Sequence, residues 1–265
     1  MEQHALQLTL GPVMALRMER EHGDLEPSAP NFAERCSHVN SHWRRVALAT
    51  PVLWRELKFS RVVDKNERER LWLQRSKHTL LSIHLPAMNK HLFNDLLETL
   101  RPHLHRAQLI SNDRQHIKHL FNLFHSLPLR MDNLRTLELR ADDASSHVPV
   151  EGTVQNFFEE GAPHLQEVIL ERIPLSLVAF PTNNITKLSL VQSEICVLRL
   201  DTLLQSVAST LQWLYFELNT VDPPQSNFTI PLQCSSNPTH FPNLHTLELA
   251  EDGIITSTHI LTNFE

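Results

Sequence analysis

Apolar and polar positions along the chain follow a short pattern that returns many times. The pattern spans six residues, has apolar residues at positions one, four and six, and recurs at intervals of 20 to 33 residues. Alternation of apolar and polar positions is typical of a strand with one buried face. The copies are LLSIHL from Leu80, LHRAQL from Leu104, LRTLEL from Leu134, LQEVIL from Leu165, ITKLSL from Ile185, LQWLYF from Leu211 and LHTLEL from Leu244.

Segments with helical spacing separate several of these strands. Leu92, Leu96 and Leu100 recur at four-residue steps within 88–100, and a similar spacing runs through 114–127. Shorter helices are predicted at 154–160 and 203–209. One strand and one helix cannot bury their apolar faces alone, so successive units must stack. The sequence predicts an α/β fold of the leucine-rich-repeat solenoid type, irregular in period, rather than a Rossmann-type sheet, which would show continuous Val/Ile runs and glycine turns.

The positions between the buried ones predict a second surface, on the outward side of the strands. Trp213 and Tyr215 stand out there because exposed aromatic residues are favoured interface anchors, unless the segment 221–231 folds over them. The chain from Leu200 to Glu265 contains acidic residues but no lysine or arginine. We therefore expect a protein partner that presents a basic segment with an apolar anchor. The predicted binding residues are Glu138, Arg140, Trp213, Tyr215, Glu217 and Glu248, and Arg106 and Gln108 are expected on the same face.

Composition removes several classes of protein. The chain has 265 residues, of which 41% are hydrophobic, as expected for a folded protein. It lacks the glycine-rich GxGxxG and GxxxxGK[ST] motifs of common nucleotide-binding sites. Its cysteines, Cys36, Cys196 and Cys234, are too few and too far apart for a disulfide framework or a CxxC metal site. No run approaches the ~20 apolar residues of a membrane span, so we expect a soluble protein of the cytoplasm, the nucleus or both.

Catalytic, cofactor and metal sites are not predicted. His103 and His105 alternate on a strand and His116 and His119 lie one helical turn apart, but neither pair is completed by a ligand at zinc spacing. The HExxH and GxSxG motifs of hydrolases are missing. The basic segment 35–77 carries its arginines among helix-periodic apolar residues, which does not favour nucleic-acid binding.

The segment CSHVNSHWRRVALATPVLWREL, from Cys36 to Leu57, has a different pattern. Cys36, Val39, Trp43 and Ala47 fall on one face of a predicted helix. Thr50 is predicted to cap a second short helix that begins at Pro51, since proline suits the first helical position. The residues alone indicate a small helical packing unit.

This segment also resembles part of a known motif. Ser37, His38, Val39, Trp43, Arg44, Ala47, Leu48, Thr50, Pro51, Leu53 and Trp54, followed by LWLQRS from Leu71, match the second half of an F-box. The likeness is to the F-box/leucine-rich-repeat proteins of the expanded F-box-like families of mushroom-forming (basidiomycete) fungi, in which irregular leucine-rich repeats follow the F-box. The first half of an F-box, an L-P-x-E-[IL] turn and its helix, is not found before Cys36, so the F-box is incomplete.

The resemblance implies a function and a division of the chain. An F-box of this kind docks on a Skp1-like adaptor and makes its protein the substrate-recognition subunit of an SCF (Skp1-cullin-F-box) ubiquitin ligase, while the repeats bind the substrate. By this resemblance the adaptor-binding residues are Val39, Trp43, Pro51, Leu53 and Trp54, with the two tryptophans mostly in the core. The alternative is a leucine-rich-repeat interaction module with a vestigial F-box and no coupling to a ligase. The expected organisation is a leader at 1–30, a partial F-box at 31–60, and repeats at 61–265 that end in a C-terminal truncation.

Overall fold

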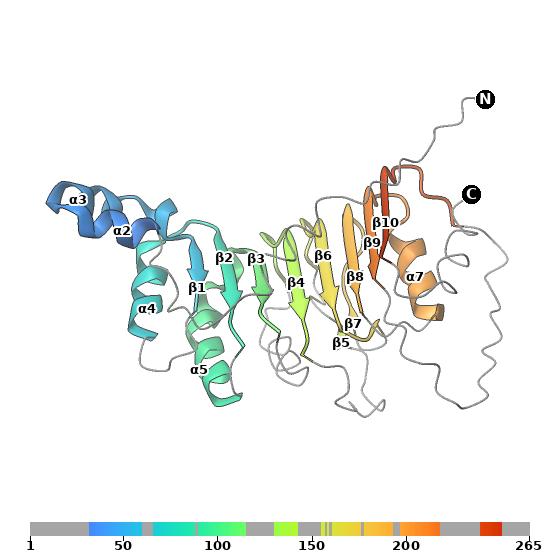
Figure 1. The fold of residues 1–265 in the computed structure, drawn as a ribbon, viewed down its shortest axis with the longest axis horizontal. Helices are drawn as coiled ribbons and strands as arrows, with labels where there is room; N and C mark the ends of the chain where they lie inside the picture. Colours follow the sequence, from blue (N-terminus) through green and yellow to red (C-terminus); the bar gives the residue numbers. More distant parts are fainter. Residues whose placement is uncertain are drawn as a thin grey trace.

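A parallel β-sheet of eight strands dominates the computed structural model of the chain (Figure 1). The structure describes residues 32–59, 66–87, 90–114, 130–142, 155–156, 158, 161–175, 178–192, 197–217 and 239–250. The strand order is β1-β2-β3-β4-β6-β8-β9-β10, so each strand pairs with the next strand of the sheet along the chain. The strands are β1 (Glu56–Lys58), β2 (Leu81–Leu85), β3 (Ala107–Asn112), β4 (Thr136–Arg140), β6 (Glu167–Glu171), β8 (Lys187–Val191), β9 (Trp213–Glu217) and β10 (Thr246–Ala250).

The described residues also form five α-helices and a second, very small sheet. The helices are α2 (Phe32–Val39), α3 (Ser41–Ala49), α4 (Asn66–Arg75), α5 (Lys90–Leu100) and α7 (Val197–Val207). Short 3-10 helices follow at η1 (Pro51–Trp54) and η3 (Arg101–Arg106), and β5 (Gln155–Asn156) pairs in parallel with β7 (Val178–Ala179). The protein therefore has a mixed α/β fold.

Columns of buried side chains run across the large sheet, because its strands are paired in register. One such column combines the fourth position of most copies of the pattern with Leu57 of β1 and Ile110 of β3, and its side chains from β1 to β9 are at most 1% exposed. This burial of one face is what the alternating pattern predicts. The column consists of Leu57, Ile83, Ile110, Leu137, Val168, Leu188, Leu214 and the partly buried Leu247.

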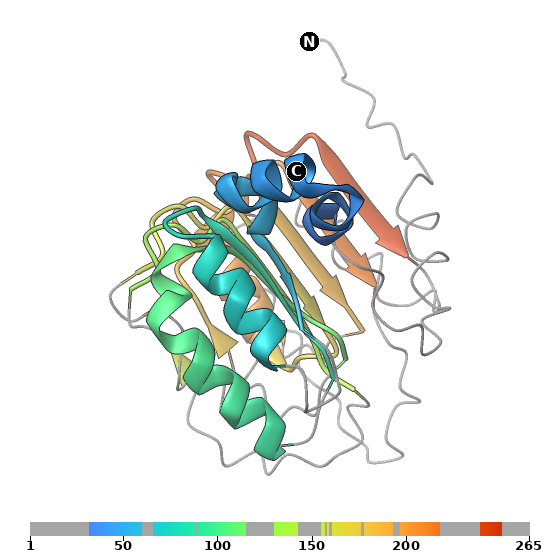
Figure 2. The same cartoon turned by 90° about the vertical axis from the view of Figure 1, so that its left-hand side faces the viewer.

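Helices α4 and α5 lie on one side of the sheet (Figure 2). The apolar residues of α5 that face inward are buried, among them Phe93, Leu96 and Leu100. Of the helix predicted at 88–100, the described part, Lys90–Leu100, is thus confirmed, and α7 confirms most of the one predicted at 203–209. At 154–160 the prediction is wrong for residues 155–156, which pair as a strand with β7. Apart from Arg114, the segment 114–127 lies outside the described residues, as do the leader at 1–30, Cys196, Cys234 and the segment 221–231.

Strand β3 departs from the pattern read in the sequence. Its register with β2 shifts by one residue between Leu81 and Ser82, so Ile110 instead of Ala107 pairs with Ile83, and Leu109, expected to be buried, is only partly buried. Arg106, expected on the outward face, is only 6% exposed and lies at the end of η3. An extra residue of this kind changes which face every later side chain of the strand occupies, which a six-residue pattern does not reveal.

At the β1 end of the sheet, α2, α3 and η1 form a small helical unit, called here the helical end, that projects beyond the strands (Figure 1). The single helix predicted through Cys36 and Ala47 is wrong, because the chain breaks at Asn40. This residue has an extended backbone, and its side-chain oxygen accepts a hydrogen bond from the Trp43 amide at 2.9 Å, which caps α3. Pro51 does begin the next helix, but the Thr50 hydroxyl donates backwards to the Val46 carbonyl instead of capping it.

Candidate functional site

Exposed apolar side chains gather on the helical end. Among the described residues, the exposed large apolar side chains are Phe32, Val39, Trp43, Val46, Leu48, Val52 and Leu71, and all but Leu71 belong to α2, α3 or η1. Single exposed apolar residues are ordinary on protein surfaces. A concentration of them in two short helices is typical of a surface that a partner covers.

The predicted adaptor-binding residues divide into three groups by exposure. Val39 and Trp43 are 65% and 49% exposed, so both are available to a partner and Trp43 is not the core residue expected. Pro51 is half-buried, and Leu53 is partly buried against the core. Trp54 is completely buried, which contradicts its placement at a binding surface and confirms its place in the core. The two tryptophans differ because the break at Asn40 turns α3 away from the sheet, whereas η1 runs directly into β1.

Trp54 joins the helical end to α4. Its indole N–H donates to the Ala47 carbonyl at 2.8 Å, its ring centroid lies 6.5 Å from that of Trp72, and the guanidinium carbon of Arg75 lies 4.5 Å from the Trp54 ring centroid. The two sequence pieces that carry the F-box likeness, TPVLW and LWLQRS, therefore pack against each other.

A second contact in this joint combines a carboxylate, an indole and a guanidinium. Glu34 of α2 accepts hydrogen bonds from Arg68 and, at 3.2 Å, from the Trp72 indole N–H. The Arg68 guanidinium carbon also lies 4.7 Å from the Trp72 ring centroid. Charge, hydrogen bonding and cation–π attraction thus act on the same three side chains, which holds α2 against α4.

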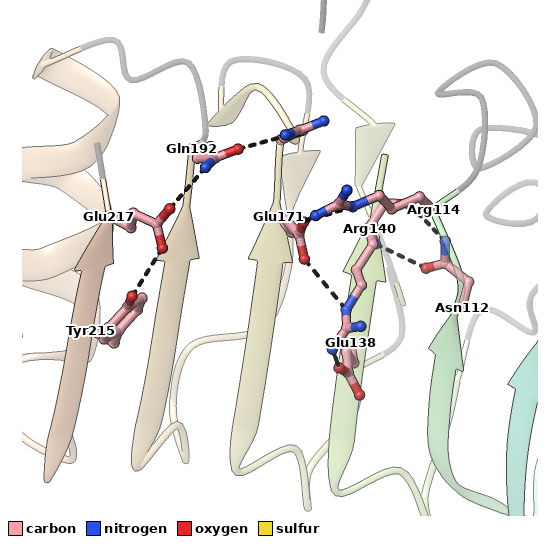
Figure 3. A network of polar contacts seen from close by, with 9 residues as sticks. Asn112, Arg114, Glu138, Arg140, Glu171, Gln192, Tyr215 and Glu217 are labelled. Carbon is pink, nitrogen blue, oxygen red and sulfur yellow. Dashed lines mark hydrogen bonds and ion pairs between the residues drawn. The ribbon is translucent and has the colours of Figure 1, made fainter. Parts of the chain in front are cut away.

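The sheet face opposite α4 and α5, called here the open face, carries polar side chains that form a network across the strands (Figure 3). Arg140 contacts Glu138 on its own strand and Glu171 on β6, at 3.5 Å from Nε to the carboxylate oxygen. Arg114 donates to the same Glu171 at 2.8 Å. Asn112 anchors this network by accepting from the Arg140 amide at 3.0 Å and donating to its carbonyl at 2.7 Å. Opposite charges are therefore paired in the middle of the open face.

The network continues to β9 through two residues with unusual backbone conformation. Arg172 and Gln192, which directly follow β6 and β8, have φ angles of 57° and 47°. The left-handed region costs a residue with a side chain roughly 1–2 kcal/mol. Arg172 donates to Gln192 at 2.8 Å, and Gln192 donates to Glu217 at 2.8 Å (Figure 3). These contacts give both strained residues a fixed partner and hold Glu217 in place.

All six residues predicted on the open face belong to strands of the large sheet, but they do not form one charged site. Glu138 and Arg140 are paired with each other, and Glu217, expected to be exposed, is buried at 6% exposure. Trp213, Tyr215 and Glu248 are half-buried and lie together at the β9–β10 end. Arg106 does not belong to this face, since its guanidinium contacts the Ser76 hydroxyl, the Thr79 carbonyl and His103.

No family model, curated protein or solved structure matches the chain. In the part of the chain that the structure describes, no group of three His, Cys, Asp or Glu side chains could hold a metal ion. His116 and His119 lie outside that part. None of the described helices is long and apolar enough to cross a bilayer.

Two sets of residues that sequence reasoning missed stabilise the sheet. Asn133, Asn184 and Asn243 each precede the first apolar residue of a repeat and donate to the carbonyl of an earlier turn, at 2.9, 2.7 and 2.7 Å. Because an asparagine stands immediately before the first apolar residue in each of these three copies of the pattern, this position could have been recognised in the sequence. His84 is the second case: its Nδ1 lies 2.6 Å from the Ser111 hydroxyl on the neighbouring strand. Burial, and then the charge of Lys58, lower the His84 pKa below its ordinary value.

Proposed function

We propose that this chain is an F-box type substrate receptor: the helical end binds a Skp1-like adaptor, and the open face of the sheet binds the protein to be ubiquitinated. In this proposal the sheet and its connections are an irregular leucine-rich-repeat solenoid. The order of the strands supports it, because every strand lies beside the next repeat and the buried leucines stack in columns.

The observation that carries the proposal is the exposure of apolar side chains on the helical end. Phe32, Val39, Trp43, Val46 and Val52 are between 40% and 67% exposed, while Trp54 beside them is fully buried. A stable fold exposes such side chains at a cost, and a partner that buries them recovers the hydrophobic free energy. Tryptophan is also enriched among the residues that dominate binding energy at interfaces. Trp43 is therefore the anchor expected at the centre of the adaptor contact.

The shape of the chain supports binding of the adaptor at one end and of the substrate at the other. The helical end projects beyond β1, whereas Trp213, Tyr215 and Glu248 lie at the opposite end of the same sheet (Figure 1). The joint formed by Glu34, Arg68 and Trp72 fixes the helical end to α4. A bound adaptor and a bound substrate would thus be held apart at a defined distance, as a ligase subunit requires.

Binding of the purified full chain to a purified fungal Skp1, followed by calorimetry, tests the proposal. The wild type is expected to bind, and Trp43→Ala is expected to weaken the complex about 30-fold or more, the loss typical of a hot-spot residue. Leu71→Ala is the matched control, because Leu71 is exposed at 44% but lies on α4, outside the group of exposed apolar side chains on α2, α3 and η1. A folded wild type that does not bind, or equal losses in the two variants, would refute adaptor docking at this surface and leave an interaction module without ligase coupling.

A further inference from the structure

Two aromatic rings stand side by side at the β9–β10 end of the open face. Trp213 and Tyr215 have ring centroids 6.0 Å apart and ring planes within 8° of parallel. A carboxylate fixes each ring: the Trp213 indole N–H donates to Glu248 at 3.2 Å, and the Tyr215 hydroxyl donates to Glu217 at 2.9 Å. We call these four residues the aromatic–acid site. Its rings are held in position before any partner arrives, which reduces the entropy that binding must overcome.

One part of this site, the indole N–H bonded to a carboxylate, also occurs elsewhere in the chain. At the joint near α4, the Trp72 indole N–H also donates to a carboxylate, that of Glu34, at the same 3.2 Å. There the Arg68 guanidinium lies over the Trp72 ring and contacts Glu34 as well. An indole bonded to a carboxylate is therefore, in this very chain, the binding place of an arginine side chain.

The aromatic–acid site has the indole and the carboxylate but no such cation. Among the described residues, no guanidinium lies over Trp213 and no ion pair is formed by Glu248. Lys187, on β8, is the register neighbour of Trp213. On the other side, β10 brings Glu248 beside Tyr215. Tyr215 lies against one face of the indole, so a stacking ligand takes the opposite face.

We propose that the aromatic–acid site binds an arginine side chain of the substrate, with the guanidinium over the Trp213 ring and against Glu248. The inference rests on the proposed function only in taking the open face as the substrate side. Arginine fits better than lysine because its planar guanidinium stacks on an indole while its N–H groups still reach a carboxylate. The partner is thus a protein segment with an arginine, and Glu217 adds a further negative charge nearby.

The experiment follows the Trp213 indole N–H signal of the full chain by NMR, assigned from the spectrum of Trp213→Phe. The probes are two capped seven-residue Gly/Ser peptides that differ only at the central residue, arginine in one and citrulline in the other. Citrulline has nearly the same shape without the charge. We expect the arginine peptide to shift the signal saturably and to bind about two- to fivefold more tightly than the citrulline peptide, the range of an exposed cation–π contact.

Two charge-neutralising variants separate the site from general attraction to an acidic protein. Glu248→Gln is expected to abolish the preference for arginine, whereas Glu98→Gln, which removes an equal charge from the exposed surface of α5, is expected to retain it. Equal binding of the two peptides, or equal effects of the two variants, would overturn the inference. Trp43→Ala is expected to leave the peptide preference unchanged, so a failure of adaptor binding and a failure of this site give different results.

Discussion

Trp43 and Trp54 belong to one sequence motif, and the structure predicts opposite consequences for their removal. Trp54 has no exposed surface, its indole N–H bonds to the Ala47 carbonyl, and Trp72 and Arg75 pack against its ring. Trp43 is 49% exposed. Truncation to alanine therefore creates a cavity at one position and removes a half-solvated side chain at the other.

The expected losses in the free energy of unfolding follow from how deeply each tryptophan side chain is buried. Truncating a fully buried tryptophan to alanine costs about 3–5 kcal/mol, because transfer and cavity terms add. Trp54→Phe keeps an aromatic ring but removes the indole donor to the Ala47 carbonyl, which then keeps only the longer bond from the Thr50 amide at 3.3 Å, so an intermediate cost of about 1–3 kcal/mol is expected. Trp43→Ala leaves no cavity and no unsatisfied partner, and its expected cost is about 1 kcal/mol.

Urea titrations of the three variants and the wild type, followed by circular dichroism, measure these differences as changes in the free energy of unfolding. The expected order of the losses is Trp43→Ala, then Trp54→Phe, then Trp54→Ala. If Trp43→Ala cost as much as Trp54→Ala, Trp43 would have to be buried in the folded chain, and both the exposed surface and the adaptor proposal built on it would fail.

Three further predictions concern single residues of the repeat region. Lys77 is exposed with a φ of 49°, so Lys77→Gly should raise the free energy of unfolding by about 0.5–1 kcal/mol, whereas Lys77→Ala should not. Asn184→Ala should lower it by about 0.5–1.5 kcal/mol by removing the bond to the Pro163 carbonyl, and Asn183→Ala, a change at an exposed neighbour, should leave it within about 0.5 kcal/mol. Because the His84 pKa is lowered in the folded chain, the unfolded chain takes up a proton first as the pH falls below its ordinary value of 6.5. Stability should therefore decrease below pH 6.5 down to the folded pKa, and denaturant titrations from pH 8 to 5 should show a smaller decrease in His84→Gln; an unchanged slope would contradict this.

The strands and their buried faces could be predicted from the sequence because they depend on local alternation. Leu137 and Leu139 of β4, for example, are read directly from LRTLEL and are fully buried. The pattern failed at β3, where the register shift puts Ile110 instead of Ala107 beside Ile83, and at Arg106, which is buried at the end of η3. It also failed at Asn40, where a cap ends one helix and starts another within an apolar spacing that looks continuous.

The candidate sites were predicted only in part, for a related reason. The sequence places Trp213, Tyr215 and Glu248 on the outward face, but Glu248 follows Trp213 by 35 positions and their hydrogen bond depends on the pairing of β9 with β10. Glu217 is an example of what the sequence pattern misses. It occupies an outward position of the alternating pattern, but it accepts hydrogen bonds from Gln192 and Tyr215 and is only 6% exposed.

By itself, the sequence determined the period of the units, the apolar face of most strands, and the presence of two tryptophans at the helical end. Local alternation and helical spacing carry this information, since they act between residues a few positions apart. Only the tertiary structure decided which tryptophan is buried, that the charges of β4 and β6 neutralise each other, and that an indole and a carboxylate meet at the β9–β10 end. These outcomes depend on strand register and on contacts between distant segments, which the order of residues does not display.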